Sequence, residues 1–147
     1  MTIEAATERF ILLNKNLRKL GMGALMETRE DYLNAQREQM LVGEDRNGEK
    51  IGDYRSKIYG EMKLVMNPRA GGNVDLKLKG GFHEELTLRP VNTVRFLVYS
   101  QDWKSKALSE KYGVSIFLLN PKHLEPYRQQ FFLPALRRWI REAIFYG

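Results

Sequence analysis

The sequence predicts a single α+β domain. In it, a small antiparallel sheet of about three to four strands packs with a long N-terminal helix, a short crossing helix and a C-terminal helix. Three observations predict this class. Apolar residues of segment 3–20 recur at steps of three and four, those of segment 74–100 alternate with polar ones, and segment 120–147 returns to helical spacing. The length of 147 residues is that of one domain.

The N-terminal segment 3–42 is expected to form two helices. The first, over 3–20, has one apolar stripe, made of Ile3, Ala6, Phe10, Leu13, Leu17 and Leu20. Of these, Phe10, Leu13 and Leu17 are expected to pack this helix on the core. Thr2 can cap the helix, and Gly21 with Gly23 is expected to end it. Segment 24–42 has less regular spacing and predicts the second helix.

The middle of the chain is expected to hold an extended loop over 43–73 and then a sheet with a short helix over 74–119. Alternation predicts strands at 74–78, 82–88 and 94–99, with a glycine pair at 80–81 forming a turn or a bulge. The expected sheet core is Val94, Phe96 and Val98. A short helix over 102–112 should follow, with Trp103 and Tyr112 bracketing it.

The C-terminal segment 120–147 predicts a helix that begins with a cap at Asn120 and proline at its first position. Pro126 and Pro134 are expected to start or kink helical pieces. Leu136, Trp139 and their neighbours form an apolar stripe, which places three arginines on the opposite, solvated face. These candidate DNA contacts are Arg137, Arg138 and Arg141.

The composition limits which kinds of site and partner the chain can have. The chain contains no cysteine, which excludes disulfides and thiolate sites, and its net charge is +6. Residues 91–147 carry five of the six surplus charges. Such a basic end suits nucleic acid, an acidic partner or simply solvent. No stretch approaches the roughly 20 apolar residues of a spanning helix, and the N-terminus lacks signal-peptide features, so we expect a soluble protein made in the cytoplasm, without a membrane partner.

No constellation of residues predicts catalysis. His83 and His123 are far apart in sequence, and a strand histidine beside carboxylates is usually a surface residue. Glu84 and Glu85 would point to opposite faces of a strand. We therefore predict that the protein is not an enzyme and has no catalytic, cofactor or metal site. A third hypothesis, a small hydrolase, is not supported because the sequence offers no convergent triad.

A resemblance covers residues 45–119. Its features are the run 45–51 (Asp-Arg-Asn-Gly-Glu-Lys-Ile), Tyr54 and Tyr59, Val74-Asp75-Leu76, the Gly81-Phe82 turn, Ser100-Gln101-Asp102 and the run 108–113 (Leu-Ser-Glu-Lys-Tyr-Gly). In these the chain resembles small morphogenesis proteins of tailed bacteriophages: neck-ring, tail-completion and minor tail subunits. It departs from them at Lys79-Gly80-Gly81-Phe82, where they often place Thr-Gly before the bulky residue.

The resemblance implies a non-enzymatic virion protein, assembled in the host cytoplasm without a cofactor. It implies a homo-oligomeric ring that contacts portal, neck or tail proteins, with DNA passing non-specifically through its lumen. Candidate contacts between subunits are Tyr54, Tyr59 and Arg69, together with the terminal aromatic residues Phe145 and Tyr146. The alternative hypothesis is a nucleic-acid-binding accessory protein that uses the basic C-terminal third.

Overall fold

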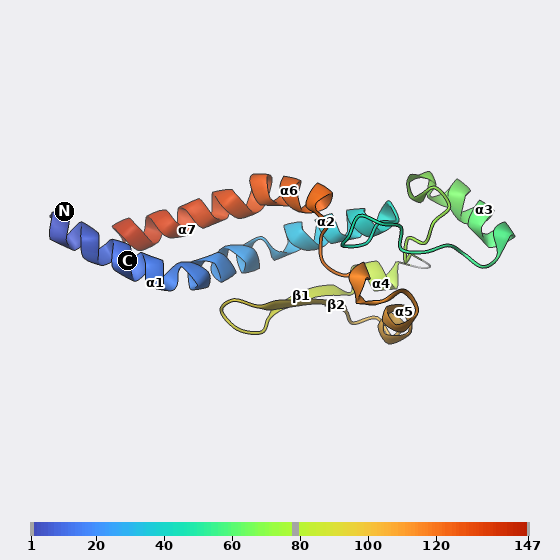
Figure 1. Ribbon diagram of the computed structural model, residues 1–147, viewed down its shortest axis with the longest axis horizontal. Helices are drawn as coiled ribbons and strands as arrows, with labels where there is room; N and C mark the ends of the chain where they lie inside the picture. Colours follow the sequence, from blue (N-terminus) through green and yellow to red (C-terminus); the bar gives the residue numbers. More distant parts are fainter. Residues whose placement is uncertain (1, 78–79, 147) are drawn as a thin grey trace.

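The protein is elongated, with a helical arm at one end and a small α+β body beside it (Figure 1). The computed structural model describes residues 2–77 and 80–146. Helices α1 (Ile3–Glu27) and α7 (Leu133–Phe145) lie antiparallel and form the helical arm, with both chain ends at its tip. Helix α3 (Lys57–Met66) lies at the opposite end. The predicted α+β class, with long N-terminal and C-terminal helices, is confirmed.

Helix α1 begins as predicted but does not end at its glycines. The Oγ1 of Thr2 accepts the N–H of Ala5 at 3.1 Å, so the cap is present. The helix then continues through Gly21 and Gly23 to Glu27. Gly23 lies against the ring of Trp139 from α7, and a Cβ there would come within 2.8 Å of it. This close tertiary packing outweighs the cost of about 0.5–1 kcal/mol for a glycine inside a helix.

The predicted loop 43–73 contains helical structure. After α2 (Arg29–Leu41), the chain forms a tight polar turn and then enters α3, whose cap is Ser56. The Oγ of Ser56 accepts the N–H of Tyr59 at 3.2 Å. A single 3₁₀ turn, η1 (Pro68–Ala70), follows and ends at Gly71 with φ of 60°.

The sheet of the described residues has two strands, β1 (Leu86–Pro90) and β2 (Phe96–Ser100), paired antiparallel with Leu86 opposite Ser100. The expected strand 74–78 is not formed over 74–77, and Leu78, like Lys79, lies outside the described residues. Leu76 has φ of 60°, which breaks an extended run. The expected start of the second strand is instead the helical turn α4 (Gly81–Glu84), since Gly80 adopts φ of 88° and accepts the N–H of Glu84.

The core lies in the body. Buried apolar side chains from α2, β1, β2 and segment 116–119 pack around Phe82 and Tyr32, whereas no residue of 2–23 is buried. Leu13 is half-buried, but Phe10 and Leu17 are exposed, so the predicted packing of the first helix on the core is wrong for these two. Among the described residues, α7 is the element that contacts α1 most, and a single neighbouring helix covers only one side of an apolar stripe.

Val94, an expected core residue of the sheet, and Trp103, expected to bracket the short helix, are both exposed. Val94 lies in the turn before β2, and Trp103 lies ahead of α5 (Ser105–Tyr112). Val98 is buried and Phe96 is half-buried, as the alternation predicted.

The C-terminal segment forms three consecutive helical pieces after the 3₁₀ turn η2 (Val114–Ile116). They are α6 (Pro121–Tyr127), the π-helical turn η3 (Arg128–Phe132) and α7. The predicted cap is confirmed, because the side chain of Asn120 accepts the N–H of His123 and proline follows it. The π-helical turn lies between Pro126 and Pro134, where regular α-helical bonds are interrupted.

Candidate functional site

The helical arm exposes a row of apolar side chains. Ile3, Phe10 and Leu17 are spaced by seven residues, close to two helical turns, so they lie along one line of α1. Their exposed fractions are 83%, 64% and 43%. At the tip of the arm, Phe145 and Tyr146 are also exposed. We call Ile3, Phe10 and Leu17 the arm row. Exposed apolar surfaces of this kind are typical of sites that bind another molecule.

The same arm concentrates positive charge. Segments 9–26 and 126–141 together contain eight basic residues and no acidic residue, although α1 and α7 as a whole also contain Glu4, Glu8, Glu27 and Glu142. At 100° per residue, Lys15 and Lys19 lie about 140° to 180° around α1 from Phe10. The arm therefore separates an apolar row from a basic face.

The three candidate DNA contacts lie on α7 and are exposed, but they are not equivalent. Arg138 pairs with Glu27 of α1 and so ties the two helices of the arm together. Arg137 and Arg141 take part in no ion pair among the described residues. The spacing predicted the basic face of α7 but gave no separate signal for Lys15 and Lys19 of α1, where the apolar stripe is the stronger pattern.

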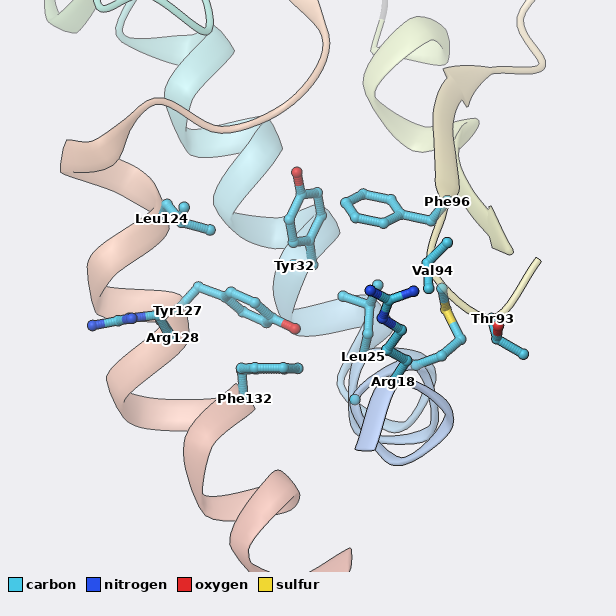
Figure 2. A pocket seen from close by; sticks show the side chains of 12 residues that line it. Arg18, Leu25, Tyr32, Thr93, Val94, Phe96, Leu124, Tyr127, Arg128 and Phe132 are labelled. Carbon is cyan, nitrogen blue, oxygen red and sulfur yellow. The ribbon is translucent and has the colours of Figure 1, made fainter. Parts of the chain in front are cut away.

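A cavity of about 580 Å³ lies where the arm meets the body (Figure 2). Its walls are mainly apolar and come from α1, α2, the turn before β2 and segment 124–132. Tyr32 and Tyr127 meet edge to face with ring centres 5.3 Å apart. Burial raises the pKa of Tyr32 to about 12, so its hydroxyl stays neutral. Arg18 and Arg128 also line the cavity. Sequence reasoning missed this cavity, since its lining comes from segments far apart in the chain.

A buried ion pair joins α3 to the segment that follows it. Lys63 Nζ lies 2.9 Å from Asp75 Oδ1 and donates to the carbonyl of Lys77 at 2.7 Å. Asp75 also accepts from Asn67 at 2.9 Å and from the N–H of Lys77. Burial alone would raise the pKa of Asp75, but these donors and Lys63 outweigh it and lower that pKa. Every oxygen of this carboxylate thus has a partner within the fold.

His83 is a structural residue rather than the surface residue expected from a strand. It lies on α4 and is buried, with Nε2 at 2.8 Å from the carbonyl oxygen of Asp75. Burial lowers its pKa. Glu84 and Glu85 end this helical turn and are exposed, so they do not converge with His83 on a cavity.

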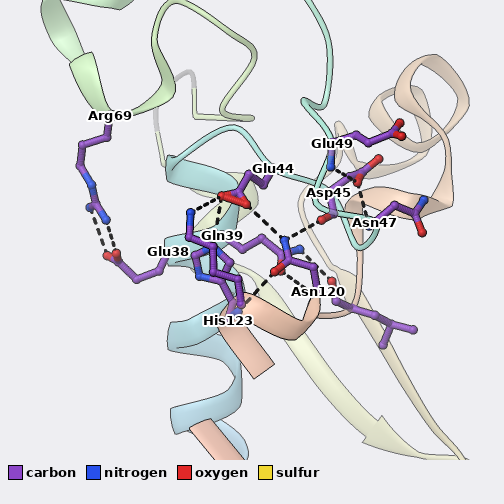
Figure 3. A network of polar contacts seen from close by, with 11 residues as sticks. Glu38, Gln39, Glu44, Asp45, Asn47, Glu49, Arg69, Asn120 and His123 are labelled. Carbon is purple, nitrogen blue, oxygen red and sulfur yellow. Dashed lines mark hydrogen bonds and ion pairs between the residues drawn. The ribbon is translucent and has the colours of Figure 1, made fainter. Parts of the chain in front are cut away.

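The proposed subunit contacts have intramolecular partners as well. Tyr54 and Tyr59 are half-buried, their rings meet edge to face, and the hydroxyl of Tyr54 lies 3.4 Å from Asp75. Arg69 pairs with Glu38 of α2, and this ion pair lowers the pKa of Glu38 (Figure 3). Of the five candidates, Phe145 and Tyr146 are the most exposed.

A second polar network joins α2, the turn after it and α6 (Figure 3). Asn120 donates to the carbonyl of Asp45 at 3.0 Å, and its N–H donates to Gln39 Oε1 at 2.7 Å. Glu44 pairs with Lys122 and lies 3.6 Å from His123 Nε2. Burial opposes ionisation of Glu44, but its contacts with Lys122 and His123 outweigh burial and lower the pKa of Glu44. The network fixes the start of α6 on the body.

No protein-family model, curated protein or solved structure matches this chain. Within residues 2–77 and 80–146, no group of three or more histidine, aspartate and glutamate side chains is arranged to hold a metal ion. No helix in the described part of the chain has the length and apolarity needed to cross a membrane.

Proposed function

We propose that this chain is a non-enzymatic structural subunit of a homo-oligomeric ring in the neck or tail-completion region of a tailed bacteriophage. In this role it joins the head portal to the tail, contacts portal, neck or tail proteins, and belongs to the virion after assembly in the host cytoplasm. The observation that carries the proposal is the exposed arm row, a long apolar surface on a helix that its own fold covers on one side only.

The basic face of the arm supports the same role. A ring around DNA needs subunit contacts on one side of each helix and positive charge on another. The arm carries both, with Phe10 and Leu17 in its apolar row and Lys15 and Lys19 on its basic face. Arg137 and Arg141 of α7 add exposed positive charge for non-specific contact with phosphates.

The alternative is a nucleic-acid-binding accessory protein that acts without a ring. The specific observation that favours it is the absence of acidic residues from segments 9–26 and 126–141. In that case the basic face alone carries the function, and affinity for a DNA duplex of mixed sequence falls steeply with salt.

Light scattering across a concentration series, in low and high salt and with and without duplex DNA, separates the two. A discrete oligomer that forms without DNA and persists in high salt supports the ring, because apolar contacts are little screened. A strict monomer that binds DNA in low salt and releases it in high salt supports the accessory protein and contradicts the ring.

A substitution then tests the observation itself. Phe10→Ser should abolish the oligomer while leaving the helical circular dichroism unchanged, since Phe10 is exposed in the isolated chain. Ile11→Ser is the matched control, because Ile11 is also exposed but lies 100° around the helix. An oligomer that survives Phe10→Ser unchanged would show that the arm row is not the contact.

A further inference from the structure

The cavity between the arm and the body has the size and lining of a site for a small organic molecule (Figure 2). Its volume of about 580 Å³ falls within the range of about 300–1,000 Å³ that is typical of such sites. Its walls are mainly apolar, with few polar side chains among them, which is also typical. We call it the junction cavity.

Three aromatic rings form one wall of the junction cavity and are held in place by contacts within the fold. Tyr32 meets Tyr127 and Phe96 edge to face, with ring centres 5.3 Å and 5.7 Å apart. The hydroxyl of Tyr127 is hydrogen-bonded to Thr28 Oγ1 at 2.7 Å. A ligand would therefore meet a wall that is already ordered, which lowers the cost of binding.

Gly21 keeps another side of the junction cavity open. It lines the cavity from α1, and a Cβ atom there would meet nothing within 4 Å. A glycine inside a helix is less favourable than alanine. The packing of Trp139 accounts for Gly23, but no such contact accounts for Gly21. The room left by its missing side chain belongs to the cavity, where a ligand can use it.

Arg18 gives the junction cavity a positive charge at its opening. It lines the cavity and is exposed, so it lies where the cavity meets solvent. It takes part in no ion pair among the described residues. Arg128 differs, because its guanidinium pairs with Glu125 and points away from the other lining side chains (Figure 2). Arg18 is thus the cation that is open to a ligand.

The acidic side chains of the surrounding helices do not neutralise Arg18. None of those in the described part of the chain lines the junction cavity. Glu4 and Glu8 lie ten or more residues before Arg18, about 15 Å or more along α1. Asp31 of α2 lines a different cavity. The other acidic side chains of α1, α2 and α6 already have basic partners, and they are Glu27, Glu30, Glu38 and Glu125.

We propose that the junction cavity binds a small organic carboxylate with an apolar tail, of the class of medium-chain fatty acids. The tail lies against the aromatic wall and fills the space at Gly21, while the carboxylate accepts hydrogen bonds from the guanidinium of Arg18. A neutral apolar molecule would leave Arg18 without a partner, and a molecule with several charges would bury them against apolar walls at high cost. The inference goes beyond the proposed assembly role and does not depend on it.

Calorimetric titration of the full-length protein in low salt tests the ligand class, with decanoate, decan-1-ol and acetate as probes. Decanoate should bind with one molecule per chain and more tightly than decan-1-ol, which has the same tail without the charge. Acetate should not bind detectably, because it has the charge without the tail. Equal affinities for decanoate and decan-1-ol would overturn the role of Arg18 in selecting the ligand.

Two matched substitutions on α1 test that role directly. Arg18→Met should weaken decanoate binding about tenfold, the loss of one charge-assisted hydrogen bond at an exposed position, and leave decan-1-ol unaffected. Lys19→Met removes the same charge at the next residue, which does not line the junction cavity, and should keep the affinity of the wild type for decanoate. Equal losses in the two variants would mean that only the overall charge of the arm matters.

Gly21→Leu tests the location. Its side chain should fill the junction cavity and prevent binding of both decanoate and decan-1-ol, while circular dichroism stays that of the wild type, because leucine is a good helix former. Unchanged binding in Gly21→Leu would place the ligand elsewhere, on an exposed apolar surface. A wild-type chain that binds no decanoate would overturn the inference and leave the proposed oligomer untouched.

Discussion

Trp139 of α7 lies directly on Gly23 of α1, where a Cβ atom would come within 2.8 Å of the indole Cη2. At Gly21, the other glycine of α1, a Cβ would meet no atom within 4 Å, so Gly23 marks the closer approach to α7. The packing of Trp139 explains why α1 continues through a residue that normally weakens helices. The contact holds α7 against α1 in the arm.

Gly23→Ala should destabilise the protein by about 1–2 kcal/mol. Overpacking against Trp139 costs about 1–3 kcal/mol, and better helix propensity offsets up to about 1 kcal/mol of this. Gly21→Ala is the matched control, since nothing lies within 4 Å of a Cβ at that position. It should stabilise by about 0.5–1 kcal/mol. Urea unfolding measures both, and equal effects of the two substitutions would contradict the close contact.

Lys63→Met should destabilise the chain by about 3–5 kcal/mol, because it leaves the buried carboxylate of Asp75 without its cation. The double variant Lys63→Met, Asp75→Asn should recover part of this loss, since no buried charge then remains. Chemical denaturation of the two variants and the wild type gives the comparison. A double variant less stable than Lys63→Met would mean that the ion pair is not what anchors α3.

The stability of the protein should fall as the pH drops below about 6.5, the ordinary pKa of histidine. Burial lowers the pKa of His83 in the folded state, so the unfolded chain binds the proton first. The contribution of the neutral ring is complete above the unfolded pKa and is lost as the pH falls through the folded one. Arg37, which donates to the His83 carbonyl at 2.8 Å, adds to the cost of charging the ring.

His83→Gln tests this origin. Its amide can still donate to the carbonyl of Asp75, but it does not titrate. Thermal melts between pH 5 and 8 should therefore show a flatter dependence in the variant than in the wild type. An unchanged slope in His83→Gln would assign the pH dependence to another group.

Asn120→Ala should cost about 2 kcal/mol of stability. It removes the cap of α6, worth about 1 kcal/mol, and one of the two donors to the Asp45 carbonyl, which then keeps only the N–H of Gly48. Thr2→Ala removes a cap of the same kind from the exposed start of α1 and should cost about 0.5 kcal/mol. Similar losses from both substitutions, measured by urea unfolding, would show that the network of Asn120 contributes little beyond its cap.

The sequence by itself determined the features that depend on neighbouring residues. The three-and-four spacing placed α1, the cap at Asn120 placed α6, and alternation located the two strands around Leu88 and Val98. These signals are local, because helix caps, proline positions and side-chain periods act within a few residues. The spacing of the apolar residues in α7 likewise predicted an apolar stripe and a basic face.

Only the tertiary structure decided what each surface contacts. In the sequence Gly23 looks like the end of a helix, but Trp139 packs on it and the helix continues. The run around Leu76 looks like a strand, but Asp75 is paired with Lys63 and Leu76 has a positive φ. Phe10 looked like a core residue, yet its own fold leaves it exposed. An apolar period says which residues share a face, but the partner of that face comes from distant segments or from another molecule.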